Sequence, residues 1–115
     1  MLLQRIYKMQ NNDAMKEKII QYIRTIYDPE LGVNIYDLGM IYKLEVNEVA
    51  GGYGAEIEMT LTSFGCPMGE YLVKQVSDAK DMIEGLNEIK VDLVFDPPWN
   101  EYNLSYEAKL TLGML

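Results

Sequence analysis

Cys66 is the only cysteine in the chain and the side chain with the widest range of chemistry. It lies in the stretch TLTSFGCPMGE, which runs from Thr60 to Glu70, directly before Pro67. Proline suits the first position of a helix, so Cys66 is predicted to lie at or beside a helix N-terminus. Unpaired N–H groups and the helix dipole stabilise a thiolate there. Because most free cysteines are buried apolar residues, the position leaves three roles open: nucleophile, metal ligand and packing.

The rest of the composition limits what this thiol can do. The chain has no histidine to activate a thiol nucleophile and no second cysteine for a C-x-x-C redox pair. An iron-sulfur cluster usually takes four thiolates, so one chain cannot hold a cluster alone. Ligation shared with a second protomer, a carboxylate or a client thiolate remains open. So do a thiol-dependent catalytic protein, in which Asp28 assists Cys66, and a pure interaction module in which Cys66 is structural.

The elements that must position Cys66 follow from the hydrophobic periodicity. Asp13 is a plausible N-cap of the first helix, which the DPE sequence at 28–30 ends. Asn34 is expected to cap a short turn that Gly39 closes. Apolar alternation and helical spacing predict a helix over 13–27, strands over 40–47 and 55–61, a helix over 67–84, a strand over 88–95, and a last helix after Ser105.

These elements predict an α/β fold with a small mixed three-stranded sheet. A hairpin and a strand-helix-strand crossover form the sheet, and the helices pack on one face. Alternation in the first strand puts Met40, Tyr42 and Leu44 on the core side. The other face carries Glu56, Glu58, Thr60 and Thr62 of the second strand and is expected either to be solvated or to meet a partner. With 115 residues and 49% hydrophobic residues, the chain suits one domain, which we expect at 13–115 after an N-terminal arm at 1–12.

The charge of the chain excludes several classes of partner. A formal net charge of -8 repels phosphate backbones and anionic lipid headgroups, so neither nucleic acid nor a membrane is expected to bind. No apolar run approaches the roughly 20 residues that span a bilayer. The N-terminal residues also lack the apolar core of a secretory signal. We therefore expect a cytoplasmic protein.

Four stretches of the sequence carry a resemblance to a known family. DPELGVNIYDLGMIYKLEV, MTLTSFGCPMG, VDLVFDPPWN and LSYEAKLTLGML resemble, in order and spacing, the metal-sulfur cluster assembly domain family that includes SufT and PaaD. The resemblance runs from about Lys16 to the C-terminus. It implies a small α/β fold and a non-enzymatic factor for iron-sulfur cluster assembly. The implied partners are client iron-sulfur apoproteins and cluster assembly proteins.

The resemblance also implies the site residues. The family's motif cysteine falls on Cys66, its acid on Asp28 with Glu30 beside it, and its strand threonines on Thr60 and Thr62. We expect these residues to bind the cofactor, with Cys66 and Asp28 as metal ligands. The expected cofactor is a transient iron-sulfur cluster or iron, absent from protein purified in air. Since each chain supplies one thiolate, a bound cluster would be shared, most simply across the two-fold axis of a homodimer.

Two further features of these motifs carry expectations. The PPW sequence at 97–99 is expected to form a rigid corner with Trp99 packed over the core. Ser63 and Phe64 stand where many family members have a Thr-Pro pair. Met68 and Gly69 replace a small aliphatic pair, and a glycine there weakens the first turn of a helix.

Overall fold

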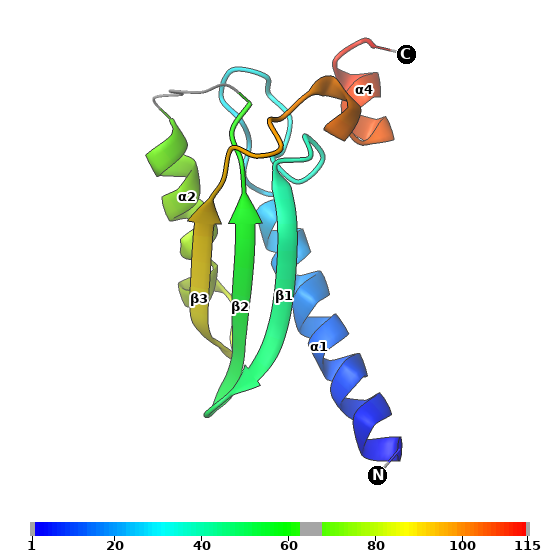
Figure 1. The fold of residues 1–115 in the computed structure, drawn as a ribbon, viewed down its shortest axis with the longest axis vertical. Helices are drawn as coiled ribbons and strands as arrows, with labels where there is room; N and C mark the ends of the chain where they lie inside the picture. The colour runs from blue at the N-terminus through cyan, green and yellow to red at the C-terminus, as the bar shows by residue number, and fades with distance from the viewer. Residues whose placement is uncertain (1, 63–67, 115) are drawn as a thin grey trace.

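The computed structural model describes residues 2–62 and 68–114, and their side chains from residue 11 onward. The elements, in chain order, are α1 (Leu2–Ile23), β1 (Ile41–Val49), β2 (Gly52–Met59), α2 (Gly69–Ser77), α3 (Ala79–Met82), β3 (Leu86–Leu93), the 3-10 helix η1 (Glu101–Asn103) and α4 (Tyr106–Thr111) (Figure 1). In this part of the chain, no helix is both long and apolar enough to cross a membrane.

The three strands form one mixed sheet in the order β1-β2-β3. β1 and β2 pair antiparallel as a hairpin, and β2 and β3 pair parallel. The crossover between β2 and β3 contains α2 and α3, since a parallel pair cannot be joined by a tight turn. The predicted fold class is confirmed.

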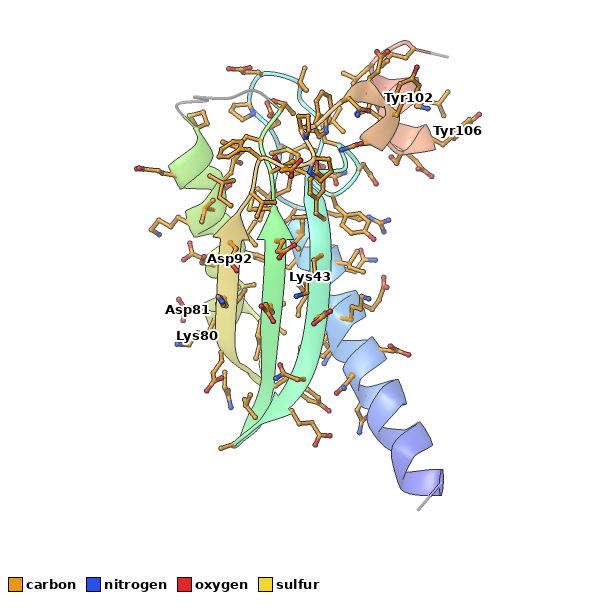
Figure 2. The ribbon with its side chains drawn as sticks, in the orientation of Figure 1. Lys43, Lys80, Asp81, Asp92, Tyr102 and Tyr106 are labelled. Atoms are coloured by element: carbon orange, nitrogen blue, oxygen red, sulfur yellow. The ribbon has the colours of Figure 1, made fainter. Side chains whose placement is uncertain are left out.

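One face of the sheet is buried beneath the helices. Met15, Ile19 and Ile23 recur every four residues along α1, and they join Ile57 and Met59 of β2 in a single core. The apolar side chains of α2 and α3 complete this core; they are Leu72, Val76 and Ala79. The opposite face carries charged side chains, among them Lys43 of β1 and Asp92 of β3 (Figure 2).

Helix α1 has other bounds than the sequence predicts. It begins at Leu2, so the predicted N-cap Asp13 lies within the helix, as does the predicted boundary between residues 12 and 13. It ends at Ile23 and not at Tyr27. Beyond that point the N–H groups of Thr25 and Ile26 bond three residues back, to the carbonyls of Tyr22 and Ile23. This tighter turn ends the helix and still buries Ile26.

Tyr42 lies outside the core, contrary to the predicted alternation. A β-bulge interrupts the pairing, because Ile41 faces Met59 while Lys43 faces Glu58. Tyr42 is the extra residue on β1, and Ile41 packs against the core in its place. The Tyr42 hydroxyl instead donates a hydrogen bond of 2.9 Å to the carbonyl of Pro97.

Candidate functional site

Two of the predicted site residues lie at the carboxyl end of β2. Thr60 and Thr62 follow directly after this strand. The loop after α1 and the segment after β3 meet the same end of the sheet (Figure 1). Cys66 is one of residues 63–67, which lie outside the described part of the chain. The departures at Ser63 and Phe64 lie there as well.

Thr60 is fully buried, although it continues the alternation of Glu56 and Glu58 on the open face. The segment after β3 accounts for this burial. Its first N–H, that of Val94, donates to the Met59 carbonyl at 2.8 Å, and its Pro97 carbonyl bonds to Tyr42 of β1. The segment therefore crosses the end of β2. The expectation that Thr60 lies on a solvated or partner-facing surface is wrong.

The Thr60 hydroxyl has no hydrogen-bond partner among the described residues. Its backbone N–H is paired, since it donates to the Met40 carbonyl at 2.8 Å. A buried hydroxyl without a partner costs free energy, and native structures contain few of them. Its free O–H can donate one hydrogen bond to an anion such as a thiolate or a sulfide. Thr62 is half-buried.

Helix α2 starts against the end of β2. A side chain at Gly69 would lie 2.6 Å from Cδ1 of the buried Leu61, so a larger residue there would require the Leu61 side chain to shift. The glycine that weakens the helix in isolation thus lets its first turn lie close to Leu61. At its N-cap position, Met68, no side chain within the described residues caps the helix. Uncapped N–H groups attract anions, so the start of α2 favours negative charge close to the end of β2.

Asp28 is buried in a turn, and its side chain stabilises that turn. Its Oδ1 accepts hydrogen bonds from the N–H groups of Glu30 at 2.8 Å and Leu31 at 3.2 Å. Only 3% of the residue is exposed. Backbone hydrogen bonds link the turn to Thr60. The N–H of Ile35 donates to the carbonyl of Ile26, the N–H of Met40 to the carbonyl of Ile35, and the N–H of Thr60 to the carbonyl of Met40.

Glu30 is exposed, unlike Asp28. Within residues 2–62 and 68–114, no group of three or more histidine, cysteine, aspartate or glutamate side chains could hold a metal ion. The structure thus gives Thr60 and Asp28 buried positions on linked backbone segments, while Glu30 points to solvent. Metal ligation by Asp28 stays a prediction.

The predicted corner at Trp99 is found, and it holds two loops together. Trp99 packs partly buried against the core, and its Nε1–H donates to the Leu38 carbonyl at 2.6 Å. Leu38 belongs to the predicted turn, in which Asn34 accepts a hydrogen bond from the Asp37 N–H and Gly39 has a φ of 75°.

A polar groove beside this corner was not predicted. It has a volume of about 510 Å³ and is lined by Gly39, Ile41, Tyr42, Glu58, Asp96, Pro97 and Asn103. The bulge at Tyr42 places its side chain in the groove wall. The sequence carries no local signal for that bulge, so periodicity alone assigned Tyr42 to the core.

Comparison with known proteins gives one consistent result. A family model described as iron-sulfur cluster assembly protein matches residues 16–93. The chain is 40% identical over 107 residues to an Fe-S protein maturation auxiliary factor of Porphyromonas gingivalis, a match that covers 91% of this chain and 99% of that protein. It is 38% identical over 89 residues to the Fe-S protein maturation auxiliary factor SufT of Staphylococcus aureus, a match that covers 77% of this chain and 98% of that protein.

A solved structure has the same fold. The crystal structure of a domain of unknown function, DUF59, from Bacillus anthracis superposes with a TM-score of 0.81 at 35% sequence identity. The superposition covers 93% of this chain and 99% of that one.

Proposed function

The chain belongs to the iron-sulfur cluster assembly protein family, and we propose that it helps to load iron-sulfur clusters onto client apoproteins, with Cys66 as the cluster-contacting thiol. One observation carries the role in cluster maturation: relatives about 40% identical over nearly their full length are named Fe-S protein maturation auxiliary factors. The role of Cys66 is a further step, supported by the surroundings of the segment that carries it.

Those surroundings suit a thiolate or a cluster edge. Sequence places Cys66 between Thr62 and Met68, so its segment links the end of β2 to the start of α2, which no described side chain caps. The helix dipole there favours an anion. The Thr60 hydroxyl, which has no partner among the described residues, can donate a hydrogen bond to a sulfur anion. The helix dipole and the Thr60 hydroxyl both stabilise a negatively charged group. Neither of them provides an additional thiolate ligand.

Weak retention of a cluster follows from this ligand count. A cluster prefers thiolate ligands, and each chain contributes one. We propose that two chains share a cluster across a two-fold axis and release it readily to a client. The protein purified in air should then contain no iron, and anaerobic reconstitution should give at most about one cluster per dimer, by the thiolate count. Iron and sulfide analysis with mass measurement tests this. A stable cluster on a monomer, or one retained in Cys66→Ala, would contradict the ligand assignment.

The function itself is tested in cells. Deletion of the gene should lower the activity of cluster-dependent enzymes, and the wild-type gene should restore it. Cys66→Ser should fail to complement at equal protein abundance, because serine cannot supply a thiolate. Ser77→Ala provides a matched control, since that hydroxyl donates to the Val73 carbonyl within its own helix. Normal enzyme activity in the deletion strain would refute the proposal.

Two alternatives give different results in this experiment. A pure interaction module with a structural Cys66 predicts full complementation by Cys66→Ala. A catalytic thiol assisted by Asp28 predicts that Cys66 is alkylated as a thiolate well below the ordinary pKa of a cysteine. The helix dipole at the proposed cluster-contacting thiol lowers this pKa as well, so the rate of Cys66 alkylation measured against pH can exclude the catalytic alternative but cannot by itself establish it. An ordinary pH profile would leave no activated nucleophile.

A further inference from the structure

Helix α4 carries apolar side chains on two opposite sides. Leu104, Ala108 and Leu112 face the protein, where they are buried or packed against the core. At 100° per residue, Tyr106 and Leu110 lie on roughly the opposite side of the helix. Tyr106 is 65% exposed and Leu110 is 51% exposed. A helix that covers a core with one face ordinarily presents polar residues on the other, so this outer face is suited to a partner.

Tyr102 extends this apolar face beyond the helix. It belongs to η1, four residues before Tyr106 in the chain, and is 85% exposed. Figure 2 shows Tyr102 and Tyr106 together at the corner formed by η1 and α4, beside the end of the sheet. We call Tyr102, Tyr106 and Leu110 the α4 face.

The polar groove adjoins the α4 face, and its charge is negative. Asn103 lines the groove and follows Tyr102 directly in the chain. Glu58 and Asp96 supply the carboxylates of the groove, and neither forms an ion pair with another described residue. Lys43, which faces Glu58 across the strands, pairs with Glu45 and Glu56 instead. These carboxylates are thus available to a cation from outside.

The corner is fixed in place before any partner arrives. The Ser105 N–H donates to the Asp37 carbonyl at 2.8 Å, and the Asn103 side chain donates to the Tyr42 hydroxyl at 3.3 Å. A side chain at Gly39 would overlap Asn103, so the turn and η1 are in close contact. A surface held in this way loses little conformational entropy on binding.

We propose that the α4 face and the polar groove together bind a short segment of a partner protein that carries apolar side chains next to arginine or lysine. The apolar side chains would cover Tyr106 and Leu110, and a cation would reach Glu58 and Asp96 past the ring of Tyr102, where an arginine can also stack. A second copy of this chain is a poor occupant of this surface, because a two-fold contact here would set Glu58 and Asp96 of one copy against the same carboxylates of the other.

The surface lies at the same end of the sheet as the residues that lead to Cys66 (Figure 1). A client held there would be close to the proposed site of cluster delivery, so the biological meaning of the surface rests on the proposed function. The binding itself involves only the residues named above and can be tested without a cluster.

The test uses a defined probe with the full-length chain. The probe is a fluorescent amphipathic peptide of about 12 residues, built from leucine and arginine, a length that fills one helix face. Two matched peptides replace either every arginine with glutamine or every leucine with serine. Binding is followed by fluorescence anisotropy, and backbone amide shifts locate the peptide on the protein. We expect the largest shifts in η1, α4 and the groove, and weaker binding of both matched peptides.

Two comparisons, each of a variant with a control, separate specific docking from general attraction to an acidic protein. Tyr106→Ala with Leu110→Ala should weaken binding at least about tenfold, as expected for exposed anchor residues. Met82→Ala, which removes an exposed apolar side chain of α3, should change it less than about twofold. Glu58→Gln with Asp96→Asn should weaken binding and reduce its salt dependence more than Asp81→Asn with Glu84→Gln, a control of equal charge.

Three outcomes would overturn the inference. If each variant and its control lost the same amount of peptide affinity, the attraction would be nonspecific. A dimer that Tyr106→Ala dissociates would assign the α4 face to a second copy. Binding to neutral lipid vesicles that the same substitution abolishes would assign it to a membrane. Failure of Cys66→Ser to complement is independent of all three, so the two proposals can fail separately.

Discussion

Replacing Thr60 with valine should make the protein more stable and less active. The Thr60 side chain is fully buried, and its hydroxyl has no partner among the described residues. Valine has a similar shape but no polar atom, so the substitution removes an unpaired buried hydroxyl. Leaving such a group unpaired costs about 1–3 kcal/mol. Allowing for imperfect packing of the new methyl group, we expect a gain of about 1 kcal/mol, or about 4 °C in Tm.

Urea unfolding of the cluster-free protein, followed by circular dichroism, measures this gain. Thr111→Val is the matched control, because the Thr111 hydroxyl is exposed and donates to the Glu107 carbonyl in its own helix. The control should change the free energy of unfolding by less than about 0.5 kcal/mol. If the Thr60 hydroxyl bonds to a sulfur anion during cluster loading, Thr60→Val should also complement the deletion strain poorly. A loss of stability above about 1 kcal/mol would refute the reasoning, since it would mean that the hydroxyl is paired in the free protein.

Three further predictions concern the surroundings of the site, each measured by urea unfolding. Asp28→Ala should lower the free energy of unfolding by about 1–3 kcal/mol, because two backbone N–H groups lose their acceptor, whereas Asp28→Asn, which keeps an acceptor, should cost less than about 1 kcal/mol. Trp99→Phe should cost about 1–2 kcal/mol, since the Leu38 carbonyl loses its donor; no loss would show that water replaces it. Burial, reinforced by the negative charge of Asp78, raises the pKa of Tyr22 above 10.0. The folded chain then keeps this proton to higher pH than the unfolded chain, so stability should fall as the pH rises above about 10, and fall less steeply in Tyr22→Phe.

The sequence predicts those parts of the fold that short-range patterns encode. Alternation identifies the hairpin and β3, and the residues between β2 and β3 have helical spacing. Local chemistry also predicts the turn capped by Asn34 and the start of α4, where the Ser105 hydroxyl accepts a hydrogen bond from the Ala108 N–H. Each of these features depends on residues within a few positions of one another, so a single sequence is sufficient.

The errors arise where distant segments decide the structure. Thr60 is buried because residues 94–97 cross the end of β2, and no pattern near Thr60 indicates that crossing. Tyr42 leaves the core because a bulge inserts one residue into β1, so that Ile41 packs against the core instead, while Leu44 beyond the bulge keeps its predicted side. Metal ligation by Asp28 is not one of these errors and stays a prediction; its described hydrogen bonds hold a turn. Cys66 itself, the residue most readily identified from sequence, lies outside the described residues, so its role awaits experiment.

The most direct measurement of the central claim is the cluster content of a client protein. An iron-sulfur enzyme is purified anaerobically from the deletion strain that carries either the wild-type gene or Cys66→Ala, and iron and sulfide are determined per client polypeptide. The proposed function predicts clients with normal polypeptide abundance but a lower cluster content in the Cys66→Ala strain than in the wild-type strain. Equal cluster content in the two strains would contradict the role assigned to Cys66. Equal content in the uncomplemented deletion strain would contradict the maturation role itself.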